Sequence, residues 1–224
     1  VRKHAAEWNI NPDDVGIMGF SAGGHLATMI ATRTELGARP AFQILFYPVT
    51  SLDSWGGHQG TADQFLGEAV HDRRMIMEYS ADKQVKKHTT PPAIIFCAAD
   101  DNVVPPSHNA LVYATAMMQA ENEAQLHIYP SGGHGWYLEK GFEYKDEVLD
   151  ALDDWLVKLP SPEKGAVKVA CIGDSITFGV GASTTYVDLL RSDFKEAIAY
   201  GACGSCVTPG ANPVKSLLER YPDM

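Results

Sequence analysis

Two serines lie in short motifs in which a hydroxyl could act as a nucleophile. Ser21 lies in the run Gly19-Phe20-Ser21-Ala22-Gly23, and Ser175 lies in the run Gly173-Asp174-Ser175. Each motif follows an apolar run that is typical of a buried strand. A serine hydroxyl is a weak nucleophile until a neighbouring base takes its proton. Both motifs therefore predict acyl-transfer chemistry, provided that a histidine, an acid and oxyanion donors lie close by.

The first serine has such partners elsewhere in the chain. A G-x-S-x-G run holds its serine at a sharp turn between a strand and a helix, where the next N–H, that of Ala22, faces the developing oxyanion. His134 lies in a glycine-rich loop after a strand, and Asp100 and Asp101 follow the preceding strand. The carboxyl ends of parallel strands meet at one sheet edge. We therefore expect Ser21 as nucleophile, His134 as base and Asp101 as acid, with Asp100 as the alternative acid.

The second serine has no base in its own part of the sequence. Between Ser175 and Met224 there is no histidine. A serine without a base is weakly reactive, so we expect Ser175 to be inactive on the sequence given. A Gly-Asp-Ser turn can also act as the N-terminal cap of a helix. We expect this turn both to cap a helix and to carry the position of a nucleophile.

Apolar runs alternate with helical patterns along the chain, which predicts an α/β protein with parallel sheets. Strands are expected at 15–20, 42–49, 93–99, 125–129, 167–172 and 197–200. Helices are expected at 1–8, 25–36, 107–120, 143–159, 186–194 and 213–221, with short helices in a polar insertion over 51–90. A Pro-Ser-Pro stretch predicts a linker at 160–166, which separates a first domain (1–159) from a second (167–224).

Composition excludes several classes of function. The 224 residues are 45% hydrophobic and carry a net charge of −10, which argues against nucleic-acid binding because phosphates call for a basic surface. No apolar run approaches the roughly 20 residues that span a bilayer.

We expect no metal and no cofactor. Cys203 and Cys206 have metal-like spacing, but a zinc site would need a second ligand pair, so a plain loop pair is expected.

Several other residues are expected to have structural roles. Cys97 and Cys171 lie in strand-like runs and are expected to be buried. Trp136 has two equal interpretations, a wall of the substrate pocket or a cap on the core. The remaining histidines except His4 are expected to be surface or packing residues: His25, His58, His71, His88, His108 and His127.

Residues 1–160 resemble the α/β-hydrolase superfamily, in particular its acetylxylan and feruloyl esterase-like branch. The resemblance is carried by GFSAGGHLA at 19–27, ADDNVVP at 99–105 and HIYPSGGHGW at 127–136. It implies that Asp101, in the D-x-x-V-P pattern, is the acid. It also implies hydrolysis of small acyl esters, often acetyl groups on plant polysaccharide, and a secreted or periplasmic location, although no signal-peptide pattern is present.

Residues 171–183, CIGDSITFGVGAS, resemble the opening block of the SGNH (GDSL) hydrolases, a flavodoxin-like α/β family. The run from Tyr200 to Ser205 resembles the second block of that family. The resemblance implies Ser175 as the nucleophile and Gly204 as an oxyanion donor. The later blocks, which carry an oxyanion Asn and an Asp-x-x-His dyad, are not in the sequence.

The first domain departs from its family in one respect. The family has about four strands before the nucleophile strand, one followed by an H-G-G-x loop that supplies a second oxyanion donor, and neither occurs here. We therefore expect a piece of a larger two-module enzyme. We also expect the nucleophile strand to be an exposed edge through which chains self-associate. Two alternatives remain: a serine peptidase of the prolyl-oligopeptidase type, and a catalytically incomplete chain with a binding role.

Overall fold

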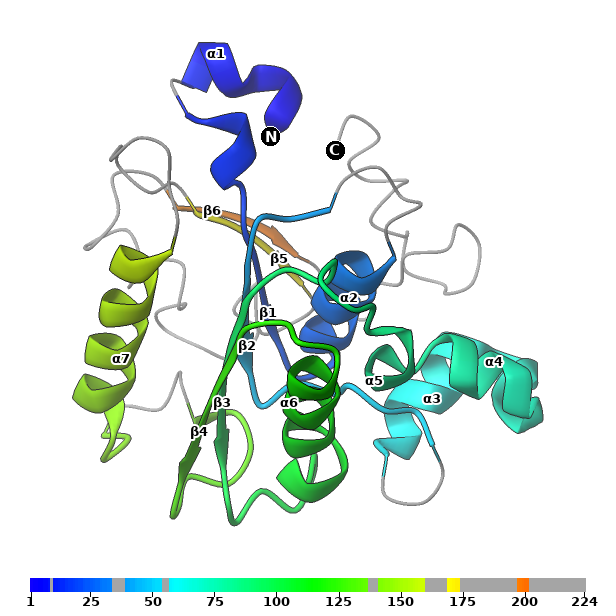
Figure 1. Cartoon of the computed structure of the whole chain (residues 1–224). Helices are drawn as coiled ribbons and strands as arrows, with labels where there is room; N and C mark the ends of the chain where they lie inside the picture. Colours follow the sequence, from blue (N-terminus) through cyan, green and yellow to red (C-terminus); the bar gives the residue numbers. More distant parts are fainter. Residues whose placement is uncertain are drawn as a thin grey trace.

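The computed structural model describes residues 1–8, 10–33, 39–53, 57–136, 141–159, 169–173 and 197–201 (Figure 1). They form a parallel sheet with helices on both faces, as the alternating pattern predicts. In the described part, no helix is both long and apolar enough to cross a membrane.

The sheet has six strands in the order β4-β3-β2-β1-β5-β6, and all pairings are parallel. Each expected strand is present, with bounds that differ by up to three residues. The strands are β1 (Ile17–Phe20), β2 (Gln43–Phe46), β3 (Ala93–Ala98), β4 (Ala124–Tyr129), β5 (Val169–Gly173) and β6 (Ala197–Gly201).

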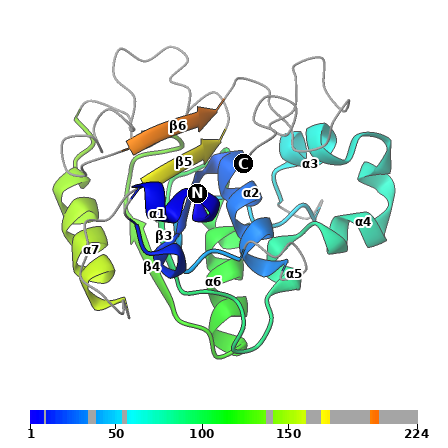
Figure 2. The same cartoon turned by 90° about the horizontal axis from the view of Figure 1, so that it is seen from above.

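Alternate side chains of the strands face two separate layers, because successive residues of a strand point to opposite faces. Phe20, Phe46 and Phe96 pack on the face covered by α7 (Lys145–Lys158), through Val148, Leu152 and Trp155 of that helix. Leu45 and Ile95 pack on the other face, against α2 (Ser21–Thr32) and α6 (Ala110–Gln119). Figures 1 and 2 show α7 on one side of the sheet and α2 and α6 on the other.

The polar segment between β2 and β3 contains the short helices that its composition predicts. They are α3 (Gln59–Leu66), the 3₁₀ turn η4 (Gly67–His71), α4 (Arg73–Glu78) and α5 (Ala81–Gln84). The remaining elements are η1 (Arg2–His4), α1 (Ala5–Trp8), η2 (Pro12–Asp14) and η5 (Pro106–His108). Figure 2 shows α3 and α4 at one side of the molecule, beyond α2 and α5.

The expectation that the nucleophile strand forms an exposed edge is wrong. β5 lies parallel to β1, with Met18 opposite Cys171, and β6 lies beside β5. A strand at the edge of a sheet has unpaired N–H and C=O groups that can pair with another strand. Here β5 pairs with that side of β1. Self-association remains a prediction, but the outer strands of the described sheet are β4 and β6. The expected linker at 160–166 lies outside the described residues.

Candidate active site

Ser21 lies at a strained turn between β1 and α2. Its φ of 51° falls in the left-handed region that a non-glycine residue seldom adopts. The turn needs close backbone approach, because a Cβ on Gly19 would lie 2.4 Å from the carbonyl oxygen of Gly23. The N–H groups in the first turn of a helix have no acceptor within the helix, and that of Ala22 directly follows the serine. The turn therefore presents a hydroxyl beside N–H groups that have no acceptor within the helix, as the motif predicts.

The side chains of Ser21, His134 and Asp101 form a continuous hydrogen-bonded chain. Ser21 Oγ lies 2.8 Å from His134 Nε2, and His134 Nδ1 lies 2.7 Å from Asp101 Oδ2. This geometry fits an imidazole whose Nδ1–H donates to the carboxylate and whose Nε2 accepts from the hydroxyl, a tautomer assigned from the hydrogen bonds. The structure therefore brings together the three residues that the sequence predicts.

Asp101 is buried and its second oxygen is also bonded. Oδ1 accepts backbone N–H groups from Val103 at 2.9 Å and Val104 at 2.8 Å. The residue is only 2% exposed, so both oxygens are fixed without much contact with water. Its negative charge is also felt by the thiol of Cys97, whose pKa is raised to about 12, first by burial and then by Asp101. Cys97 is buried, as expected.

The ring of His134 is also supported from the side by Tyr47. Their ring centroids lie 4.9 Å apart at an interplanar angle of 62°. Tyr47 comes directly after β2, is 1% exposed and has a φ of 35°. Left-handed backbone in a residue of this size is uncommon and is found preferentially at functional sites. Sequence reasoning missed this residue, because nothing in the Phe46-Tyr47-Pro48 run predicts a contact with the histidine.

Asp100 makes contacts different from those of an acid partner. Its side chain is exposed and accepts backbone N–H groups from Gly132 at 3.3 Å and Gly133 at 2.8 Å. Its neighbour Asp101 makes the contact with His134. Of the two candidate acids, the structure therefore places Asp101 against the imidazole and Asp100 against the loop that leads to it.

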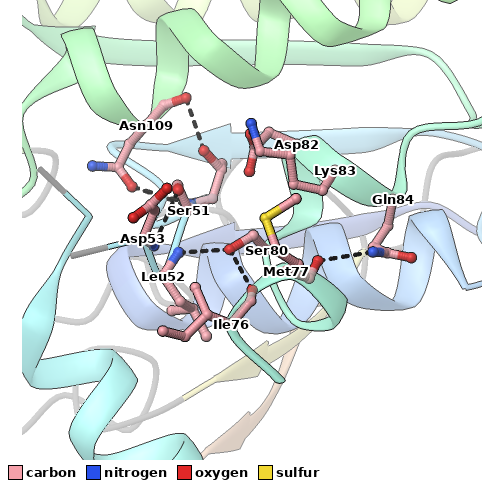
Figure 3. Close-up of polar contacts among 11 residues, drawn as sticks. Ser51, Leu52, Asp53, Ile76, Met77, Ser80, Asp82, Lys83, Gln84 and Asn109 are labelled. Atoms are coloured by element: carbon pink, nitrogen blue, oxygen red, sulfur yellow. Dashed lines mark hydrogen bonds and ion pairs between the residues drawn. The ribbon is translucent and has the colours of Figure 1, made fainter. Parts of the chain in front are cut away.

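The chain that leaves β2 is held by a buried polar network (Figure 3). Asn109 Oδ1 accepts the N–H groups of Thr50 at 3.1 Å and Ser51 at 3.4 Å, and Ser80 Oγ accepts that of Leu52 at 3.0 Å. Ser80 Oγ in turn donates to the carbonyl of Ile76 at 2.7 Å. The first part of this segment also touches the nucleophile turn, because the Val49 N–H donates to the Ser21 carbonyl at 3.0 Å.

His58 follows this segment and is electrostatically coupled to the site. Burial lowers its pKa; the positive form of His134 lowers it further, and the negative Asp101 raises it. Its Nδ1 lies 3.1 Å from the N–H of Thr61, which it accepts as the N-terminal cap of α3, and 2.8 Å from Thr61 Oγ1. In the neutral ring the proton is therefore on Nε2. The sequence predicts a surface or packing role for His58, because nothing in the order of residues along the chain indicates that it lies near the triad.

The two interpretations of Trp136 are resolved in favour of the core. Its side chain is fully buried and stacks on Phe142 with centroids 4.0 Å apart. It meets Phe46 and Tyr47 edge to face. His25 is buried as well, with Nε2 2.7 Å from the carbonyl of Tyr79, and the side chains of His71, His88 and His108 are exposed. These four histidines are therefore surface or packing residues, as the sequence predicts.

Four residues singled out in the second segment lie outside the described residues: Ser175, Cys203, Gly204 and Cys206. Of that segment the structure describes β5 and β6, whose last residues, Gly173 and Gly201, lie opposite each other. Within the described ranges, no group of three or more His, Cys, Asp or Glu side chains is arranged to hold a metal ion.

Comparisons with curated proteins find two relatives. The chain is 50% identical over 182 residues to an acetylxylan esterase of Xylanibacter ruminicola, a match that covers 81% of this chain and 38% of the relative. It is 31% identical over 146 residues to endo-1,4-beta-xylanase B of Butyrivibrio fibrisolvens, covering 60% and 22%. The matched part is thus well under half the length of either relative.

Solved structures show the same fold. An acetyl ester-xyloside bifunctional hydrolase from Caldicellulosiruptor lactoaceticus superposes with a TM-score of 0.64 at 31% identity, over 70% of this chain and 61% of that one. The propionate-bound esterase Est2 of Thermogutta terrifontis superposes with a TM-score of 0.58 at 28% identity, over 74% and 63%. A family profile described as the alpha/beta hydrolase fold matches residues 1–138, and the chain therefore belongs to the α/β-hydrolase family.

Proposed function

We propose that this chain is the catalytic part of a serine carboxylesterase that removes small acyl groups, principally acetyl, from xylan or related carbohydrate. The observation that carries the proposal is the unbroken path from Ser21 Oγ through His134 to Asp101, with contacts of 2.8 and 2.7 Å. Further support comes from the names of two similar proteins, an acetylxylan esterase and an acetyl ester-xyloside hydrolase.

The reaction begins with proton transfer from Ser21 to His134 Nε2. The serine oxygen attacks the ester carbonyl, and the Ala22 N–H at the start of α2 donates to the resulting oxyanion. Asp101 stays ionised and stabilises the imidazolium. When the tetrahedral intermediate collapses, the carbonyl–alkoxy bond breaks and His134 gives its proton to the leaving alcohol, which leaves an acyl-serine.

The second half of the reaction uses water in the place of the serine. His134 takes a proton from the water as its oxygen attacks the acyl-serine carbonyl. The intermediate collapses to release the carboxylic acid, and the proton returns to Ser21 Oγ. The proton that leaves with the alcohol is replaced by one from water, so the triad is restored and the proton transfers are all made by His134.

The second segment is proposed to be the start of an SGNH hydrolase module, with Ser175 as its nucleophile and Gly204 as an oxyanion donor. The similarity to the acetylxylan esterase is consistent with this division, because it spans 182 residues, more than the 166 up to the end of the expected linker, and so continues into the second segment.

The proposal is tested by measuring acetate release from acetylated xylo-oligosaccharides and 4-nitrophenyl acetate, beside a matched 4-nitroanilide amide. We expect the esters to be hydrolysed and the amide to remain intact. Ser21→Ala should lower kcat by about 10⁴-fold or more, as loss of a triad nucleophile does, and Ser175→Ala should leave the rate within about twofold of wild type. Cleavage of the amide alone would favour the peptidase alternative, and no turnover of any substrate would favour a non-catalytic role.

A further inference from the structure

The loop that carries His134 consists largely of residues with little conformational preference. Gly132, Gly133 and Gly135 have φ values of 142°, 62° and 85°, which a glycine adopts without strain but also leaves easily. A catalytic base displaced by about 1 Å can lower a rate by about 10²-fold. Something must therefore hold this backbone in one conformation.

A single exposed carboxylate bonds to both residues that precede the histidine. Asp100 Oδ2 lies 3.3 Å from the N–H of Gly132, and Oδ1 lies 2.8 Å from that of Gly133. The turn that bears Asp100 is itself fixed between β3 and β4, because the Ala99 N–H donates to the carbonyl of Tyr129 at 2.7 Å. Hydrogen bonds to an ionised acceptor are stronger than those between neutral groups.

On the basis of the function proposed above, we propose that Asp100 is a positioning residue, which holds the loop so that His134 Nε2 faces Ser21. The two adjacent carboxylates then have separate tasks. Asp101 is 2% exposed and binds the imidazole directly, whereas Asp100 is exposed and binds the backbone leading to it.

The number of acceptor oxygens at position 100 determines how large a loss of activity we expect. A carboxylate accepts both N–H groups, whereas an asparagine has one acceptor oxygen and an alanine has none. We expect Asp100→Ala to lower kcat by about 10-fold and Asp100→Asn by about threefold, with KM within about twofold of wild type. Because Asp100 is exposed, its replacement should change the midpoint of thermal unfolding little.

The experiment compares these variants with Asp154→Ala in the intact protein, using hydrolysis of 4-nitrophenyl acetate across pH. Asp154 is an exposed aspartate on α7, so its replacement removes the same charge without touching the loop. NMR adds a direct reading of position. The downfield proton between His134 Nδ1 and Asp101 should be sharp in wild type, in Asp154→Ala and in Asp100→Asn, and broadened in Asp100→Ala.

The possible outcomes distinguish failure of the positioning role of Asp100 from failure of the proposed esterase function. Equal losses in the asparagine and alanine variants, with the same shift of the acid limb of kcat/KM, would show a charge effect and overturn the positioning role. Wild-type rates in both variants would also overturn it. A wild-type protein that fails to hydrolyse any ester would instead count against the proposed function, and the NMR comparison would still test how Asp100 holds the loop.

Discussion

Ser21 and His134 are separated by 113 positions in the chain, yet Ser21 Oγ lies 2.8 Å from His134 Nε2. The contact is possible because both residues follow parallel strands, β1 and β4, whose carboxyl ends share one edge of the sheet. The intervening strands β2 and β3 bring Tyr47 and Asp101 to the same edge.

The left-handed backbone of Ser21 is expected to lower the stability of the protein while it places the nucleophile. Glycine accepts a φ of 51° without the steric penalty that alanine and serine share. We expect Ser21→Gly to have a free energy of unfolding about 1 kcal/mol higher than Ser21→Ala, with both variants inactive. Urea unfolding of the two variants measures the difference. An alanine variant at least as stable as the glycine variant would show that the turn stores no strain.

The close packing of Gly19 predicts that this position tolerates no side chain. A Cβ there would lie 2.4 Å from the Gly23 carbonyl oxygen and 2.8 Å from Ala27 Cβ. Backbone cannot move aside as a flexible side chain can, so Gly19→Ala should lower the free energy of unfolding by about 2 kcal/mol. Gly60→Ala is the matched control, because its nearest neighbour is the side chain of His58 at 3.2 Å. Equal effects on unfolding by urea would contradict this account of the turn.

The features that the sequence predicts correctly are those set by residues that are close together in the chain. The strand, turn and helix around Ser21 are set by neighbours in the chain, and Asp101 and His134 follow from the ends of later strands. The pairing of β5 with β1 depends on a strand about 150 residues away, and no local pattern encodes it. The contacts of Asp100 were missed for another reason: its partners are backbone N–H groups, which have no signature in residue type.

The buried His25 predicts that stability declines in mild acid. Burial lowers its pKa below the usual 6.5, and its hydrogen bond to the Tyr79 carbonyl opposes this shift only in part. The unfolded chain therefore binds the proton more readily, and the free energy of unfolding falls as pH drops through 6.5 toward the folded pKa. Urea unfolding between pH 7.5 and 5 should show a flatter dependence in His25→Gln than in wild type. The control variant His71→Gln, at an exposed position, should keep the wild-type dependence on pH. The same flattening in that variant would show that the pH dependence does not come from His25.

The coupling of His58 to the site predicts shifts of opposite sign in two variants. Burial lowers the pKa of His58 most, the positive form of His134 lowers it further, and the carboxylate of Asp101 raises it. We therefore expect Asp101→Asn to move the His58 pKa further down and His134→Gln to move it up. Histidine ring resonances followed by NMR during a pH titration report both changes. Identical values in wild type and both variants would show that His58 lies apart from the site.

The contacts among Ser21, His134 and Asp101 are expected to make Ser21 an activated nucleophile. A fluorophosphonate probe reacts with such a serine, and peptide mass spectrometry identifies the modified residue. We predict that the wild-type protein is labelled at Ser21 and not at Ser175, and that Ser21→Ala and His134→Gln remain unlabelled. A wild-type protein without label, or one labelled at Ser175 while Ser21 stays free, would show that these contacts do not activate Ser21.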